Sequence, residues 1–105
     1  MGRVAVIAAS GELDMLTAPQ LRDAVQAALD KSPEGLIVDL TNVDFLGSAG
    51  MQVLMEARNQ TDGTSTRYAV VAEGAATSRP LKITGIADLI DLFASLDVAL
   101  ENVSA

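Results

Sequence analysis

The chain alternates short apolar runs with longer segments in which apolar residues recur at helical spacing. Residues 4–9, 36–40 and 68–72 are rich in Val, Ile, Leu and Ala, and each run is too brief for a typical helix. We therefore expect a buried strand in each of these runs. Residues 89–93 predict a further, short edge strand.

Helices are predicted between these strands and after the last one. The first has Pro19 in its opening turn, and the second begins at Ser48. A short third helix is expected within residues 74–83 and is stopped by Gly85, and Ser95 is placed to cap a fourth. Because strands and helices alternate, the pattern predicts an α/β fold with at least partly parallel strand pairing.

The length and composition fit one domain that spans residues 1–105. A chain of 105 residues and 10.9 kDa has the common size of a single domain, and it contains no internal repeat, linker or low-complexity tract. Half of the residues are apolar but only 3% are aromatic. The core must therefore be built from aliphatic side chains, which suits thin layers of sheet and helix.

Missing residue types exclude several kinds of chemistry. The sequence has no Cys and no His, which removes disulfides, thiolate metal sites, cysteine nucleophiles and a Ser-His-Asp triad. Its net charge of −7 repels nucleic acid and anionic lipid. No apolar window reaches the roughly 18 to 20 residues that span a bilayer, and the N-terminus lacks a signal-peptide layout. We expect a cytoplasmic, non-enzymatic protein with no cofactor, no metal, and no direct contact with nucleic acid or membrane.

One segment, residues 43–51, combines apolar anchors, two glycines and a single hydroxyl where a strand gives way to a helix. As a helix N-cap, the Ser48 oxygen would accept a backbone hydrogen bond and contribute about 1 kcal/mol. As a phosphoacceptor, Ser48 would be accessible because Gly47, Ala49 and Gly50 are small. A phosphate there adds about −1.5 to −2 charges beside the positive end of the helix, which the fold tolerates but a partner would have to desolvate. The two interpretations are compatible.

Other interpretations of this segment are weaker. A nucleotide cradle lacks the lysine of a P-loop, and a hydrolase nucleophile elbow needs different glycine spacing and a histidine base. Outside the segment, Asp14 follows the first strand and is expected to cap the next helix or to touch a partner. Met51 and Met55 fall on one helical face and are expected in the core, with Met51 also placed to be shared with a partner.

Three stretches of the sequence resemble one known family. Gly11-Glu12-Leu13-Asp14, the 36–40 strand and Phe45-Leu46-Gly47-Ser48-Ala49-Gly50 are similar to the STAS-domain family of anti-sigma factor antagonists, over nearly the whole chain. The resemblance implies a mixed β-sheet of about four strands flanked by about four helices. It also implies a protein that binds an anti-sigma factor, often a serine kinase, and thereby frees a sigma factor for transcription. Phosphorylation by the kinase switches such an antagonist off, and a phosphatase restores it.

The family's phosphoserine maps onto Ser48, with departures on both sides. Gly47 replaces the usual Asp, and Ala49 replaces a second hydroxyl residue, so a single phosphoacceptor remains. The Phe-Leu-Gly-Ser variant resembles antagonists from actinobacteria, in which Gly occupies that place. The residues expected to bind the partner are Asp14, Leu46, Gly47, Ser48, Ala49, Gly50 and Met51.

A further departure lies at the front of the chain. Family members carry an additional N-terminal strand, whereas here the first apolar run begins at Val4. Either that strand is missing or the numbered chain is a shortened version, and an exposed strand edge would promote pairing, so a monomer or weak homodimer is expected. The alternative function is a STAS interaction module or scaffold in another signalling complex, such as a stress-response assembly, without control by phosphorylation.

Overall fold

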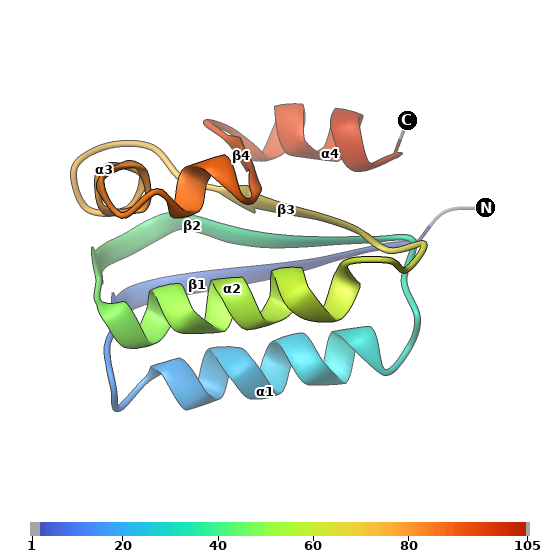
Figure 1. The fold of residues 1–105 in the computed structure, drawn as a ribbon, viewed down its shortest axis with the longest axis horizontal. Coiled ribbons are helices and arrows are strands. Elements are labelled where there is room, and N and C mark those ends of the chain that lie inside the picture. The colour runs from blue at the N-terminus through green and yellow to red at the C-terminus, as the bar shows by residue number, and fades with distance from the viewer. Residues whose placement is uncertain (1–2, 105) are drawn as a thin grey trace.

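The computed structural model describes residues 3–104, in which helices and strands alternate along the chain (Figure 1). The elements are β1 (Val4–Leu13), α1 (Ala18–Leu29), β2 (Gly35–Leu46), α2 (Ser48–Thr61), β3 (Arg67–Val71), α3 (Ser78–Ile83), a 3-10 turn η1 (Ile86–Asp88), β4 (Asp91–Phe93) and α4 (Leu96–Ser104). The predicted α/β class, with four strands and four α-helices, is confirmed.

The strands form one sheet in the order β1-β2-β3-β4, and every neighbouring pair is parallel. The resemblance implied a mixed sheet, but residues 3–104 contain no antiparallel strand pair. The reason is that a helical crossover follows each of the first three strands and returns the chain to the same end of the sheet. Among the described residues β1 pairs only with β2. The expected weak dimerisation through this edge stays a prediction.

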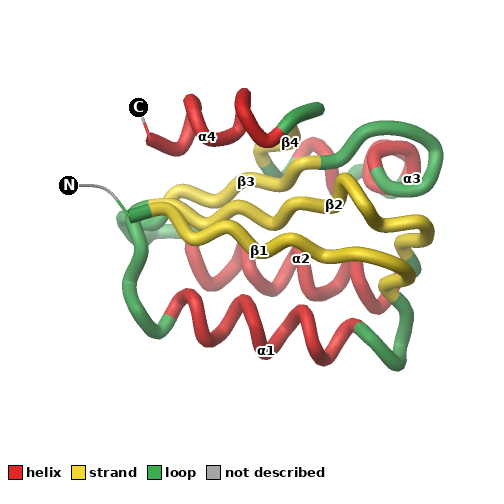
Figure 2. Tube along the Cα trace, turned by 180° about the vertical axis from the view of Figure 1, so that it is seen from behind, coloured by secondary structure: helices red, strands yellow, loops and turns green. Residues whose placement is uncertain are grey.

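Helices cover both faces of the sheet. Figure 2 shows α1 and α2 against one face and α4 against the other. Successive residues of β2 serve the two layers in turn, because strand side chains alternate between faces: Leu36 and Val38 join the α1/α2 core, and Ile37 joins the α4 core. Burial on both faces explains why the sequence of this strand is an uninterrupted apolar run.

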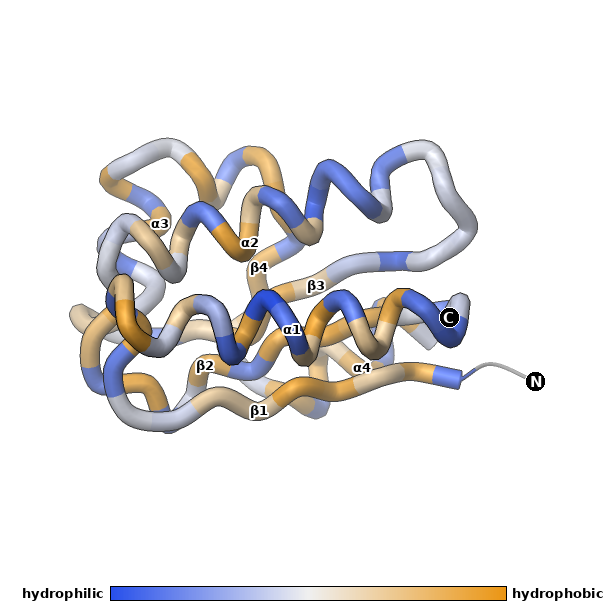
Figure 3. The backbone as a smooth tube through the Cα atoms, turned by 90° about the horizontal axis from the view of Figure 1, so that it is seen from below, coloured by the Kyte–Doolittle hydropathy of each residue, from blue (hydrophilic) through white to orange (hydrophobic). Residues whose placement is uncertain are grey.

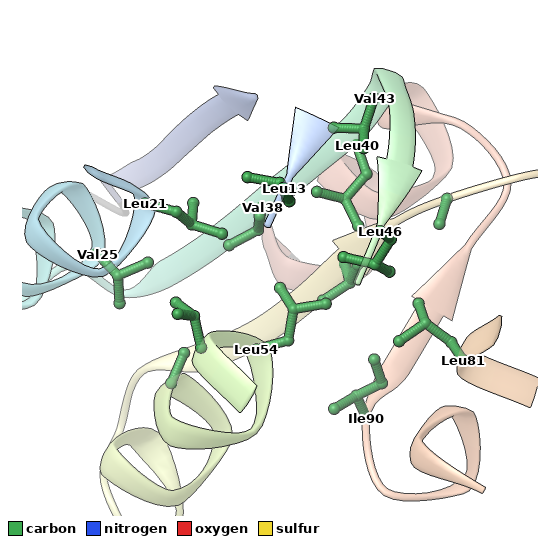
Figure 4. Packing of buried hydrophobic residues seen from close by; sticks show 14 of the residues in the cluster. Leu13, Leu21, Val25, Val38, Leu40, Val43, Leu46, Leu54, Leu81 and Ile90 are labelled. Carbon is green, nitrogen blue, oxygen red and sulfur yellow. The ribbon is translucent and has the colours of Figure 1, made fainter. Parts of the chain in front are cut away.

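The larger core lies between the sheet and helices α1 and α2 (Figure 4). Leu21 and Val25 of α1 and Leu54 of α2 project into it and are almost fully buried. Hydrophilic positions interrupt the hydrophobic ones along both helices, as expected for helices with one face toward solvent (Figure 3). The exposed ion pair of Arg22 and Glu56, at 2.8 Å, also joins the helices but contributes little beside this packing.

The first two strands are longer than the apolar runs predicted. β1 continues to Leu13 and β2 to Leu46, through polar residues that still pair across irregularities between Ala8 and Ser10 and between Gly11 and Glu12. β4 is shorter than expected, with residues 91–93 of the predicted 89–93. Two predicted helix boundaries are confirmed. Gly85 ends the α3 turn with a φ of +83°, and the Ser95 oxygen accepts the Val98 N–H at 3.3 Å.

The aliphatic core predicts a clear contrast between two leucines. Leu54 is fully buried, so Leu54→Ala should lower the free energy of unfolding by about 2–5 kcal/mol through lost burial and a cavity. Leu16 is 84% exposed, and Leu16→Ala should change it by less than about 0.5 kcal/mol. Urea denaturation of both variants measures the difference, and equal losses would contradict the packing described above.

Candidate functional site

The candidate site lies where β1 and β2 end and the two long helices begin. Leu13 is opposite Leu46 in the parallel register, and the Gly47 N–H donates to the Leu13 carbonyl at 2.9 Å. The turn after β1 and the turn after β2 are therefore fixed side by side, at the end of the molecule where α1 and α2 start (Figure 1). We call residues 13–17 and 45–51 together the carboxyl edge.

Ser48 is the first residue of α2 and is exposed. The N-cap is Gly47, which has an extended conformation with φ −88° and ψ 177°. The prediction that Ser48 is the N-cap is therefore wrong by one residue, because the Gly47 carbonyl accepts the Met51 N–H at 3.1 Å and so begins the helix. No side-chain hydrogen bond caps this helix, and the Ser48 hydroxyl has no partner among residues 3–104. It is left facing solvent, and its phosphorylation stays a prediction.

Gly50 allows α2 to approach the strand ends. A Cβ at this position would lie 2.9 Å from the Leu13 Cβ and 2.9 Å from the Leu46 Cδ1, closer than carbon atoms pack. A Cβ on Gly47 would lie 3.0 Å from the Phe45 ring at Cε2. Gly50 is therefore required by packing, whereas a larger residue at Gly47 requires movement of a half-exposed aromatic ring.

The expected partner-binding residues divide into three groups by burial. Leu46 and Gly50 are buried, so they shape the edge and do not present a side chain to a partner. Ser48 is exposed. The half-buried members are Asp14, Gly47, Ala49 and Met51. Met51 also contacts the residue that caps the end of α3, because the Thr84 hydroxyl lies 3.9 Å from its sulfur.

Asp14 holds the turn that leads into α1. Its Oδ1 accepts the backbone N–H groups of Leu16 at 2.9 Å and Thr17 at 3.1 Å, and the Thr17 hydroxyl donates to the Glu12 carbonyl at 2.6 Å. Thr17 is the N-cap residue of α1, so the Asp14 carboxylate caps the preceding turn and not the helix itself. The Leu16 and Thr17 N–H groups lower the pKa of the Asp14 carboxyl, because they stabilise its charged form.

Sequence reasoning missed three apolar side chains at this edge. Met15 is 81% exposed, Leu16 is 84% exposed and Phe45 is 52% exposed. A signal was present in the sequence, since two large apolar residues follow each other in the segment between a predicted strand and a predicted helix. Their exposure depends on the turn geometry set by Asp14, which the apolar pattern does not encode.

The carboxyl edge is an open surface around Ser48. A cavity of about 250 Å³ lies between β1 and α1 and reaches Leu13 and Thr17, but no residue of α2 lines it. Within residues 3–104, no group of three acidic side chains is placed to hold a metal ion. Over the same described part of the chain, no helix is both long and apolar enough to cross a membrane. The arrangement at Ser48 suits contact with a macromolecule better than enclosure of a small molecule.

Two serines at helix starts provide a matched test of the cap assignment. Ser48→Ala should change the free energy of unfolding by less than about 0.5 kcal/mol, because no cap hydrogen bond is lost. Ser95→Ala should cost about 1 kcal/mol, because the bond to the Val98 N–H is removed. Urea denaturation compares them, and a larger loss for Ser48→Ala would restore its role as a cap.

The lowered pKa of the Asp14 carboxyl predicts a pH-dependent contribution to the free energy of unfolding. A carboxyl whose folded pKa is lowered stabilises the fold above its ordinary value of 3.8, and the contribution disappears as pH falls through the folded pKa. The amide of Asp14→Asn can still accept hydrogen bonds but carries no charge. Wild type should therefore be more stable than Asp14→Asn at neutral pH, and the gap should narrow in acid. Urea denaturation across this range measures the gap, and a gap independent of pH would be inconsistent with this origin.

Comparison with known proteins identifies similar chains. A family model described as the STAS domain matches residues 1–99. The anti-sigma-F factor antagonist RsfB of Mycobacterium tuberculosis is 38% identical over 100 residues, which cover 95% of this chain and 81% of the relative. The anti-sigma-B factor antagonist of Listeria monocytogenes is 28% identical over 83 residues, with coverages of 79% and 73%. The crystal structure of an anti-sigma factor antagonist from Mycobacterium paratuberculosis superposes with a TM-score of 0.91 at 40% identity, over 97% of this chain and 86% of that one.

Proposed function

The chain belongs to the STAS domain family, and from this membership we propose that it is an anti-sigma factor antagonist. In this proposal it binds an anti-sigma factor through the carboxyl edge, so that the anti-sigma factor no longer holds its sigma factor. The similarity to anti-sigma factor antagonists over most of the chain supports this function. The observation that most supports this binding site is the position of Ser48. It is exposed at the start of α2, on an edge held by the Gly47–Leu13 hydrogen bond.

Phosphorylation of Ser48 is the proposed switch. A serine kinase, the anti-sigma factor itself in this proposal, transfers a phosphoryl group from ATP to the Ser48 oxygen and releases ADP. The added charge lies beside the positive end of the 14-residue helix α2, so the fold persists. A partner that accepts a neutral turn would have to desolvate a dianion, and the complex dissociates. A separate phosphatase hydrolyses the phosphoserine and restores binding.

The surroundings of Ser48 support access by a kinase. Its side chain is exposed, and its neighbours Gly47 and Ala49 are small. In this proposal the chain works by binding in the cytoplasm, performs no catalysis, and needs no cofactor and no contact with nucleic acid.

A second candidate function is a STAS interaction module or scaffold that phosphorylation does not control. Gly47 favours it, because the Asp that the family resemblance leads one to expect is absent beside Ser48. Loss of that carboxylate removes repulsion against a phosphate but also removes a group with which a kinase could recognise the turn.

A pull-down from extract of the source cells tests the proposal. Wild-type chain, Ser48→Glu and Ser48→Ala are immobilised, and captured proteins are identified by mass spectrometry. We expect wild type and Ser48→Ala to capture an anti-sigma factor and Ser48→Glu to lose it, because only Glu adds negative charge. The captured factor is then purified, and the wild-type chain should release a sigma factor from a preformed complex with it.

The outcomes separate the candidate functions. Equal capture of the anti-sigma factor by all three proteins would favour an unswitched module. Capture of other signalling proteins without any anti-sigma factor would overturn the proposed function.

A further inference from the structure

Met15 and Leu16 are presented to solvent on a turn that is held rigidly. Large apolar side chains more than 80% exposed are ordinary on mobile loops, but this turn is fixed by the Asp14 carboxylate, and the Asp14 N–H also donates to the Thr17 hydroxyl at 2.9 Å. Rigid presentation reduces the entropy lost when a side chain is bound. The turn is therefore built in a way that favours binding by these two side chains.

Phe45 is a third exposed apolar side chain of the carboxyl edge, three residues before Ser48. Its half-exposed ring lies against Gly47, and the Gly47 N–H bond to Leu13 joins this segment to the turn that carries Met15 and Leu16. The three apolar side chains thus come from the two halves of the carboxyl edge. Phe45 and Gly47 directly precede the start of α2, where the proposed switch lies.

The charged residues next to the three apolar side chains along the chain have one sign. Glu12 and Asp44 are exposed and Asp14 is half-buried, and the chain has no Lys or Arg between Arg3 and Arg22 or between Lys31 and Arg58. Arg22 is engaged by Glu56. The basic residues of the chain nearest to α2 on its other side belong to α3, which packs on the α1/α2 side of the sheet and is separated from α1 by α2 (Figures 1 and 3). We call the three carboxylates beside the apolar side chains the acidic rim.

We propose that Met15, Leu16 and Phe45 are apolar anchors that dock into a groove with a basic rim on the anti-sigma factor. This inference rests on the proposed function and names the chemistry of the partner's surface. The acidic rim disfavours a second copy of the chain, because a symmetric contact would bring the same carboxylates together. It also disfavours an anionic bilayer, which repels carboxylates.

Anchors of this kind give two measurable signatures. Removal of a central apolar anchor commonly weakens binding by tenfold or more. The loss should be the same at low and high salt, because apolar burial is not screened, whereas the contribution of the acidic rim should fall as salt rises.

Isothermal titration of the purified anti-sigma factor from the pull-down tests the anchors. Leu16→Ala and Met15→Ala should each raise Kd about tenfold or more, equally at about 0.05 M and 0.5 M salt. The matched control is Leu89→Ala, which removes an exposed leucine outside the carboxyl edge, and its Kd should stay within about twofold of wild type. Circular dichroism checks that each variant is folded.

Each outcome has a distinct meaning. If wild type binds the anti-sigma factor and Leu16→Ala binds equally well, the assignment of these side chains as anchors is wrong, while the proposed function stands. If wild type binds no anti-sigma factor, the proposed function fails and the anchors fail with it. Sedimentation of wild type as a dimer that Leu16→Ala abolishes would assign the surface to a second copy. Co-sedimentation with vesicles of phosphatidylcholine and phosphatidylglycerol, lost in Leu16→Ala, would assign it to a membrane. Either result would overturn the proposal.

Discussion

The parallel pairing of β1 with β2 up to their last residues is the constraint on which the site depends. Because the strands are parallel and Leu13 ends opposite Leu46, the turns into α1 and α2 emerge at the same edge. The Gly47 N–H bond to the Leu13 carbonyl then fixes one turn against the other, and the absence of a side chain on Gly50 lets α2 pack onto both strand ends. Residues more than thirty positions apart in the sequence thereby form one surface.

This geometry separates the residues that build the edge from those that a partner can touch. Leu13, Leu46 and Gly50 are buried and determine where Ser48 lies. Met15, Leu16 and Phe45 lie outside the aliphatic core of the two helices and the sheet and stay exposed. A regulatory phosphate on Ser48 would change the charge of this surface and leave its supporting core untouched.

Much of the fold follows from the apolar pattern, because strands buried on both faces appear as uninterrupted apolar runs and helices with one apolar face show a clear periodicity. The apolar pattern missed the ends of β1 and β2, at residues 10–13 and 41–46. Polar residues pair there across an irregular register, and such pairing leaves no apolar run in the sequence. The motif located Ser48 at the helix start, but the prediction that Ser48 is the N-cap was wrong, because Gly47 has the extended conformation of an N-cap and its carbonyl accepts the Met51 N–H. The exposure of Met15 and Leu16 depends on local hydrogen bonds from the backbone to the Asp14 carboxylate, which the apolar pattern does not report.

The central claim is that the carboxyl edge binds an anti-sigma factor while the rest of the fold stays free. Amide NMR of the isotope-labelled chain, titrated with the purified anti-sigma factor, tests it most directly. The account predicts that signals of residues 13–17 and 45–51 shift or broaden first, while those of α4 on the opposite face of the sheet are unchanged. Perturbation centred on α4, with the carboxyl edge unaffected, would contradict it.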